Sequence, residues 1–320
     1  MKLVSIVVPN YNCEEFLPKC LDSVTSQTYP NIEIIICDNG SSDRSVEIIN
    51  EYAAKDSRIK VLINEVNQGL IKCYNRMFFE AKGDYIMIMD ADDWSDVTRA
   101  EKQAAILDKY DVGLCVTDCY FHSSLEPSYR NPRNYNGVIE AKDDESWAPA
   151  TIMFRRSILK DIPGFHPYFE RITSYDRYFI LDILARFKGY YLDEPLYHVW
   201  VRPNSDHRSI DLTEKRALTK LISQDIYDRL KAQRIETGTD FLMSNDTAGM
   251  AKLEQSMLRD RNYMADKIRK FACIQIDHGN LINAKDLLRT ALTKAPFFLD
   301  NYRTLFYYLR ARRKKQLHSH

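Results

Sequence analysis

Three carboxylates stand within four residues where a strongly apolar run ends, at Asp90, Asp92 and Asp93. The five apolar residues 85–89 before them are typical of a strand buried on both faces, as in a parallel sheet flanked by helices. The acids would then lie at the carboxyl edge of that sheet, where open α/β sheets bind ligands. Clustered carboxylate oxygens suit a hard divalent cation that holds phosphates. The sequence thus favours a metal and phosphate site here, with a solvated loop and helix cap as the alternative.

Strands and helices alternate through the first hundred residues, and this order predicts βαβ units with a mainly parallel sheet. Apolar runs predict strands at 3–9, 32–37, 59–63 and 85–89. Helical spacing predicts helices at 14–27, from 42 or 43 to about 54, and at 70–81.

The pattern then loosens, and residues 122–147 are polar and irregular, as in a binding loop or lid. Around this segment we expect a helix at 101–107, a strand at 112–120, an apolar segment at 151–154, a helix at 174–187 and a strand pair interrupted by proline at 190–200. From about residue 211 the chain has helical spacing only, and its end reads as a helical hairpin resembling one tetratricopeptide-type unit.

Composition sets further bounds on function. Lys plus Arg equals Asp plus Glu at 45 each among 320 residues, so no overall field recruits nucleic acid. No apolar run approaches the roughly 20 residues of a membrane span, so we expect a cytoplasmic protein. The seven scattered cysteines form no paired zinc motif and are expected to be reduced thiols.

Four motifs now stand in a recognisable order: residues 7–12 (Val-Val-Pro-Asn-Tyr-Asn), 38–43 (Asp-Asn-Gly-Ser-Ser-Asp), 67–69 (Asn-Gln-Gly) followed by Asn75, and 83–93. In this order and spacing the chain resembles the inverting family 2 glycosyltransferases. The resemblance implies a GT-A fold, in which a Rossmann-like, mainly parallel sheet is flanked by helices. We expect a transferase domain at 1–210, with a nucleotide-binding half at about 1–118 and an acceptor half at about 119–210, and an all-helical region at 211–320.

The resemblance also implies roles for the motif residues. Asp92 would ligate Mn²⁺ or Mg²⁺, which stabilises the leaving diphosphate, and Asp90 would face the ribose. Asp38 would bind the base, and an acceptor-only carboxylate can bind the imide N–H that uracil has and cytosine lacks, which favours a UDP-sugar. Asp38 could instead organise a turn with Gly40. Three further donor-binding residues are expected at Pro9, Tyr11 and Asn67.

An inverting transfer needs a general base for the acceptor hydroxyl. The family places it in an acidic pair after a Gly-Phe turn, here Gly164-Phe165, and the usual first acid is replaced by Tyr175. The second survives as Asp176, which we predict to be the base. Its alternative role is a first-turn acid that interacts with the helix dipole, and Glu170 and Asp182 are rival candidates.

A second departure from the family lies near residue 202. Trp200 and Arg202 stand where the family often has an arginine and, two residues later, a histidine. Arginine cannot ligate a metal but can bind phosphate oxygens, so Arg202 is a predicted donor contact, with His198 or His207 as substitute imidazoles. A surface arginine is the alternative.

The sequence therefore predicts a metal-dependent inverting glycosyltransferase that moves a sugar from a nucleotide diphosphate to a glycan or lipid-linked acceptor, in polysaccharide or surface-glycan synthesis. One alternative is a nucleotide-sugar-binding protein that has lost catalysis. A sugar nucleotidyltransferase is a further alternative, but no Gly-rich phosphate loop follows the first strand. The basic run at 310–315 predicts either peripheral contact with the inner face of a membrane or a solvated C-terminus.

Overall fold

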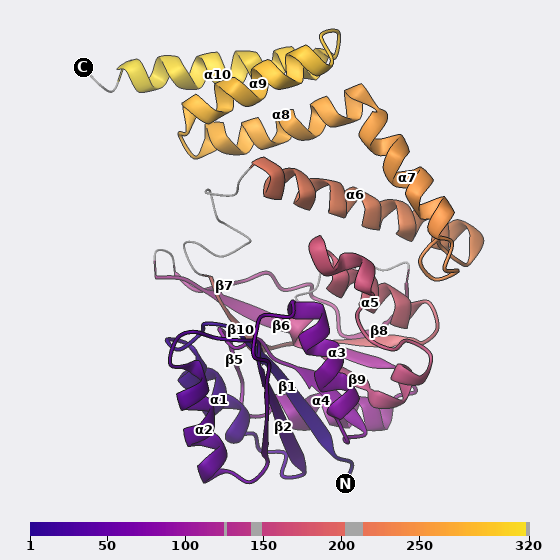
Figure 1. Ribbon diagram of the computed structural model, residues 1–320. Helices are drawn as coiled ribbons and strands as arrows, with labels where there is room; N and C mark the ends of the chain where they lie inside the picture. Colours follow the sequence, from indigo (N-terminus) through magenta and orange to yellow (C-terminus); the bar gives the residue numbers. More distant parts are fainter. Residues whose placement is uncertain (125–126, 142–148, 202–213, 318–320) are drawn as a thin grey trace. The chain divides into compact units, whose positions relative to one another are not determined.

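The computed structural model describes residues 1–124, 127–141, 149–201 and 214–317. The chain divides into two compact units, Met1–Arg202 and Pro203–His320 (Figure 1). The predicted domain boundary at residue 210 lies outside the described residues, between the last strand of the first unit and the first helix of the second.

The first unit is built on one ten-stranded sheet, in which eight strands follow the order β3-β2-β1-β4-β9-β6-β10-β5, while β7 pairs with β6 and β8 pairs with β10. Four neighbouring strands are parallel: β1 (Val4–Asn10), β2 (Ile32–Asp38), β3 (Ile59–Ile63) and β4 (Tyr85–Ile88). The rest is mixed: β5 (Trp94–Ser95), β6 (Leu114–His122), β7 (Tyr129–Arg130), β8 (Gly137–Ile139), β9 (Ile152–Arg155) and β10 (Gly189–Trp200). Strand β9 is antiparallel to both β4 and β6, so β6 and its parallel neighbour β10 run in the same direction as β4. The carboxyl ends of β1, β2, β4, β6 and β10 therefore lie at the same edge of the sheet.

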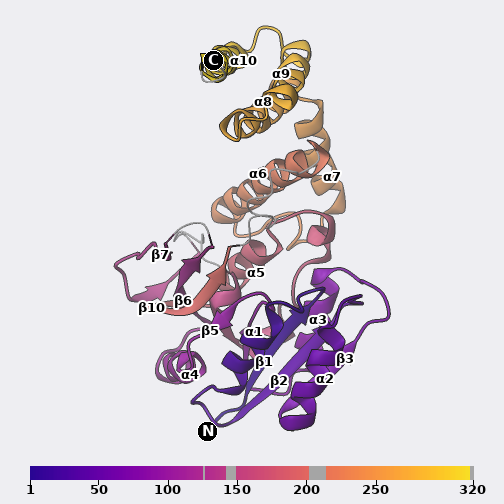
Figure 2. The same cartoon turned by 90° about the vertical axis from the view of Figure 1, so that its left-hand side faces the viewer.

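Helices flank this sheet, as the sequence predicted (Figure 2). They are α1 (Leu17–Thr25), α2 (Ser45–Lys55), α3 (Leu70–Glu80), α4 (Arg99–Lys109) and α5 (Tyr175–Leu184). Every residue of β1 and β4 is buried, which confirms that the apolar runs form strands covered on both faces. The α/β fold with an all-helical extension is thereby confirmed.

Residues 190–200 do not form the predicted pair of strands. They belong to a single strand, β10, whose register against β6 shifts on either side of Pro195. Proline cannot donate to a sheet ladder, so the chain passes it with a local irregularity and continues in the same direction.

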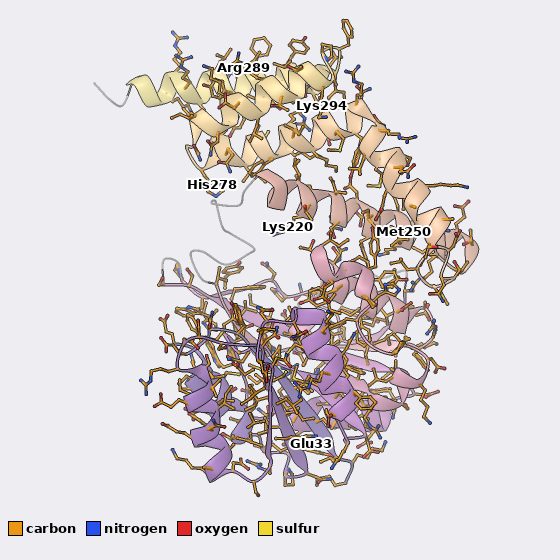
Figure 3. The ribbon with its side chains drawn as sticks, in the orientation of Figure 1. Glu33, Lys220, Met250, His278, Arg289 and Lys294 are labelled. Carbon is orange, nitrogen blue, oxygen red and sulfur yellow. The ribbon has the colours of Figure 1, made fainter. Side chains whose placement is uncertain are left out.

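The Gly83-Asp84 motif lies at the edge of the sheet opposite the acids. The Gly83 amide donates to Ser5 Oγ (2.8 Å) and to the carboxylate of Glu33 (3.1 Å), and a Cβ on Gly83 would lie 2.6 Å from the Ser5 nitrogen. Glu33 is labelled in Figure 3. Glycine is therefore required by the close approach of two backbones, and this motif serves the start of β4.

A second contact holds the Gly164-Phe165 turn against α3. The Asn75 side chain donates to the Phe165 carbonyl (2.9 Å) and accepts from the Phe165 amide (2.8 Å). The Phe165 ring packs on four other rings, with centroids 4.9–5.3 Å apart: those of Tyr74, Phe78, Tyr175 and Phe179. This aromatic cluster fixes α5 relative to α3 and hence to the loop after β4.

The described part of the second unit contains five helices: α6 (Glu214–Thr237), α7 (Thr247–Arg259), α8 (Arg261–Asp277), α9 (Leu281–Lys294) and α10 (Leu299–Leu317). Its core joins α8, α9 and α10 through buried side chains that include Phe271, Leu288 and Tyr308. The predicted helical hairpin corresponds to α9 and α10. Among the described residues no helix is both long and apolar enough to cross a membrane, and all seven cysteines are free thiols.

The Asn75 contact generates a stability prediction. Gly164 has φ +126°, and a Cβ there would lie 2.3 Å from Asn75 Oδ1. Gly164→Ala should lower the free energy of unfolding of the first unit by about 2–4 kcal/mol, because it combines backbone strain with overpacking. Urea unfolding followed by tryptophan fluorescence reports this unit, since Trp94, Trp147 and Trp200 all belong to it.

The matched control is Gly238→Ala, at φ +78° with nothing within 4 Å of the new Cβ. This substitution should lower the free energy of unfolding by about 1 kcal/mol, because only the backbone is strained. Circular dichroism of the helical unit measures this loss. Equal losses in the two variants would contradict the role assigned to the Asn75 contact.

Candidate functional site

The loop after β2 is organised by Asp38, whose side chain is almost fully buried. Its Oδ2 accepts hydrogen bonds from the amides of Gly40 (3.2 Å) and Ser41 (2.9 Å), and its Oδ1 accepts from Ser41 Oγ (2.6 Å) and Asn10 Nδ2 (2.8 Å). A carboxylate has about four acceptor sites, so all of them are in use. The structure thus shows the turn with Gly40, and a contact with a uracil imide would require one of these bonds to be exchanged.

The neighbouring loop 64–69 is joined to the same edge by Asn39. Its side chain accepts from Asn64 Nδ2 (2.9 Å) and the Gln68 amide (3.0 Å), and donates to Asn67 Oδ1 (3.1 Å). Asn67 Oδ1 also accepts from the Gly69 amide (2.9 Å), so the Asn67 side chain holds its own loop. Of the other predicted donor contacts, Pro9 is a buried residue of β1 and Tyr11 is about half exposed (48%) just beyond it.

The first acid of the cluster, Asp90, is held by a tyrosine from α3. The Tyr74 hydroxyl donates to Asp90 Oδ1 at 2.7 Å. Removal from water, followed by the charge of Asp92, raises the pKa of Asp90 to about 6, and the charge of Asp176 acts in the same direction. The structure therefore brings Asp90, Asp92 and Asp176 into one electrostatic site, although Asp176 is 84 residues further along the chain than Asp92.

Asp93 holds this loop through hydrogen bonds to β10. Its buried carboxylate accepts from the Tyr197 hydroxyl (2.8 Å) and from the Trp200 amide (2.7 Å), both on β10. The Tyr197 hydroxyl in turn accepts from the Asp90 amide (3.2 Å). Burial, and then the charges of Asp90 and Asp92, raise the pKa of Asp93 well above its usual range. Asp93 thus joins the acidic loop to the end of β10.

A buried arginine lies beside the same loop. Arg99, at the start of α4, is fully buried, and its guanidinium donates to Ser95 Oγ (3.1 Å), Gln103 Oε1 (3.0 Å) and the Ala150 carbonyl (2.7 Å). Burial lowers its pKa to about 10, and the charge of Asp90 opposes that shift. Arg99 therefore places a positive charge near Asp90, although within the described part of the chain its guanidinium forms no ion pair with a carboxylate.

The predicted base, Asp176, lies in the first turn of α5 and is half-buried. Its Oδ1 accepts from the Arg177 amide at 2.7 Å. Tyr175 fills the place of the family's other acid, and its ring packs edge-on against Phe165 at 4.9 Å. Of the rivals, Glu170 lies against Gly69 and Asp182 is half-buried in the middle of α5.

The predicted contact at Arg202 and the candidate imidazole of His207 lie outside the described residues. His198 stacks on Trp94 with ring centroids 5.2 Å apart, and its Nδ1 is 3.0 Å from His122 Nε2. Burial lowers the pKa values of both histidines, which disfavours a positive charge on this pair. His198 thus belongs to an aromatic layer at the ends of β6 and β10.

The residues of the acidic loop fit a divalent cation in their chemistry. Partly buried carboxylates of like charge repel one another, and this repulsion adds to the effect of burial in raising the pKa of Asp90. No described group of three or more His, Cys, Asp or Glu side chains forms a complete metal cage. A cation here would take ligands from Asp92 and Asp90, and phosphate and water oxygens would complete its shell.

Comparison with known proteins decides the family. The model of glycosyl transferase family 2 matches residues 5–171, just over half of the chain. The chain belongs to glycosyl transferase family 2. It is 35% identical over 218 residues to EpsE of Bacillus subtilis, which is named a glycosyltransferase, covering 63% of this chain and 74% of that protein. It is 26% identical over 239 residues to chondroitin synthase of Pasteurella multocida, 70% of this chain but only 23% of that enzyme.

Solved structures show the same fold. Staphylococcus aureus TarS in complex with UDP-GlcNAc matches with a TM-score of 0.64 and 20% identity, over 97% of this chain and 92% of that chain. The mannosyltransferase PcManGT of Pyrobaculum calidifontis, in complex with GDP-Man and Mn²⁺, matches with a TM-score of 0.55 and 19% identity, over 99% and 87%. The predicted family, GT-A fold and glycosyltransferase activity are thereby confirmed.

Three residues of this site were not predicted from the sequence: Tyr74, Arg99 and Tyr197. Tyr74 precedes the motif residue Asn75 directly, and that position was a usable signal. Arg99 resembles a basic residue on an exposed helix, and Tyr197 lies within an apolar strand, so their sequence context gave no indication of the site.

The shifted pKa of Asp90 generates a prediction for the metal-free protein. Its carboxyl binds a proton more tightly in the folded state (pKa about 6) than at the ordinary value of 3.8, so its charge destabilises the fold at neutral pH. Asp90→Asn should therefore raise the free energy of unfolding in EDTA at pH 7 by up to about 3 kcal/mol. The asparagine keeps an acceptor for Tyr74.

The gain should shrink as the pH falls through 6 and disappear near 3.8, because the wild-type carboxyl is then protonated in both states. Urea unfolding of both proteins at several pH values measures it. A loss of stability on Asp90→Asn at pH 7 would contradict the electrostatic account of this loop.

Proposed function

We propose that this glycosyltransferase moves a sugar, with inversion, from a nucleotide-diphosphate donor to a hydroxyl group of a glycan, glycolipid or similar acceptor. The observation that supports this most is the single electrostatic site formed by Asp90, Asp92 and Asp176. Two of these acids follow β4, and the third begins α5, so one site offers carboxylates suited to the donor and a separate carboxylate suited to the acceptor.

On the donor side, Asp92 and Asp90 would hold Mn²⁺ or Mg²⁺. When bound, that ion supplies positive charge that stabilises the leaving diphosphate. Asp90 would also face the ribose, with its carboxylate held by the hydrogen bond from the Tyr74 hydroxyl. The loops of Pro9, Tyr11, Asp38 and Asn67 would frame the nucleotide, and Arg202 would contact its phosphates.

On the acceptor side, Asp176 would take the proton from the attacking hydroxyl as the oxygen approaches the anomeric carbon opposite the leaving group. One carboxylate is sufficient for this step, and the replacement of the family's other acid by Tyr175 leaves Asp176 in place. The ring of Tyr175 packs on Phe165, so this residue positions the start of α5.

The donor nucleotide is proposed to be UDP. Asp38 supports this preference indirectly, because its hydrogen bonds shape the loop that would meet the base. TarS, at 20% identity, is described with UDP-GlcNAc, whereas PcManGT is described with GDP-Man, so the shared fold accommodates both bases. We further propose that the acceptor belongs to polysaccharide or surface-glycan synthesis, since the relative at 26% identity is named a chondroitin synthase.

Donor binding gives a direct test. UDP with Mn²⁺ should raise the melting temperature of the transferase unit by about 5–10 °C at a ligand concentration about 100 times Kd, because ligand binds only the folded state. UDP with EDTA should give little shift, and GDP should give less than UDP. A larger shift with GDP would overturn the uridine assignment.

Two substitutions separate the proposed roles of the acids. Asp92→Asn should abolish both sugar transfer and the Mn²⁺-dependent shift with UDP. Asp176→Asn should keep that shift while transfer falls by about 10²–10⁴-fold, the usual contribution of a general base. Donor hydrolysis and transfer to acceptor extracts are the measurements.

Glu170→Gln tests the rival base, and transfer should be unchanged in this variant because Glu170 lies against Gly69 and not at the acidic site. Unchanged transfer in Asp176→Asn would refute its assignment. Binding of UDP without hydrolysis or transfer of any donor would support the alternative of a nucleotide-sugar-binding protein that has lost catalysis.

A further inference from the structure

The charge of the chain is strongly segregated although its total is zero. Residues 261–320 contain 13 Lys or Arg and only 4 Asp or Glu, so the preceding 260 residues carry a matching excess of acid. This basic segment corresponds to α8, α9 and α10 of the helical unit. A concentration of positive charge in one unit favours an anionic partner there.

The helix α10 has two distinct faces. Asn301, Thr304 and Tyr308 are buried against the rest of the unit, at spacings of three and four residues. Leu299 and Phe306 are 74% and 67% exposed on the opposite face, which is the reverse of the usual arrangement for apolar side chains on a globular helix. Phe297, just before the helix, is 94% exposed.

Basic side chains share this outward face. Helical spacing of 3.6 residues per turn places Arg303, Arg310 and Arg313 beside Leu299 and Phe306. Of the three, Arg303 pairs with Asp300 at 2.8 Å, whereas Arg310 and Arg313 make no ion pair among residues 214–314. Tyr302 and Leu309 are exposed on its margin.

A cavity of about 400 Å³ adds to the positive charge of the same unit. It is lined by Arg261, Arg289, Thr290, Thr293 and Lys294, with three cations and no acid. Arg289 and Lys294 are labelled in Figure 3. Its cations also make no ion pair within the described part of the unit. Their potential extends over about a Debye length and strengthens attraction to an anionic surface.

We propose that the outward face of α10 docks on an anionic lipid bilayer, with Phe297, Leu299 and Phe306 inserted at the interface and the adjacent basic residues against lipid phosphates. Exposed aromatic and aliphatic side chains flanked by arginines are the features by which an amphipathic helix lies in a membrane interface. The charge of the unit selects an anionic surface over a neutral one.

Flotation of the full chain with vesicles tests the proposal. The protein should float with vesicles of phosphatidylglycerol and phosphatidylcholine, and much less with phosphatidylcholine alone. Phe297→Ser with Phe306→Ser should lower partitioning by more than about tenfold, because apolar burial is lost. Arg310→Gln, Arg313→Gln and Lys314→Gln together should lower it about 100-fold, since each basic residue contributes about 1 kcal/mol.

Matched controls keep the test specific. Phe79→Ser removes an aromatic side chain that is 87% exposed on α3, and Arg229→Gln, Lys252→Gln and Arg259→Gln together remove three exposed cations of the helical unit outside the basic segment 261–320. Both controls should float like the native chain. Circular dichroism checks folding, and UDP-sugar hydrolysis without vesicles should be unchanged in every variant, so docking and catalysis are judged separately.

Three outcomes would overturn the proposal. The first is failure of the native chain to float with anionic vesicles. The second is flotation of the Phe297 and Phe306 variant to the same extent as the native chain. Alternatively, sedimentation would show a dimer that Phe306→Ser dissociates while vesicle binding is absent, and the face would then join two copies of the chain.

Discussion

The Tyr197 hydroxyl joins the two parts of the sheet on which the site depends. It donates to Asp93 and accepts from the Asp90 amide, while Asp93 also accepts from the Trp200 amide. A buried carboxylate is costly unless it is hydrogen-bonded, so these bonds allow Asp93 to remain within the protein. They also fix the short acidic loop to the end of β10, and the direction of Asp90 and Asp92 follows from that attachment.

The same site carries a cost in stability that its function explains. Asp90 is held partly away from water beside Asp92, and its raised pKa shows that the folded protein disfavours this charge. Tyr74 and the buried guanidinium of Arg99 reduce the repulsion without removing it. Residual repulsion between the carboxylates would be relieved by a bound cation, so the proposed donor site would gain stability when a cation and a diphosphate bind.

The position of α5 depends on a different contact. Asn75 holds both backbone groups of Phe165, and the Phe165 ring packs between Tyr74 on α3 and Tyr175 on α5. Tyr74 is shared, since its ring packs on Phe165 and its hydroxyl holds Asp90. Packing at the start of α5 and the geometry of the acidic loop are therefore coupled through one side chain.

The sequence by itself determined the parallel strands β1 to β4, most of the helices and the acids of the loop, because buried runs, helical spacing and strand-end motifs are local properties of the chain. It also predicted the family, since four motifs stand in a fixed order. Only the tertiary structure placed Tyr74, Arg99 and Tyr197 around the acids, showed Asp38 saturated by its own turn and by Asn10, and continued β10 through Pro195. These results depend on contacts between residues up to 107 positions apart, which no local pattern records.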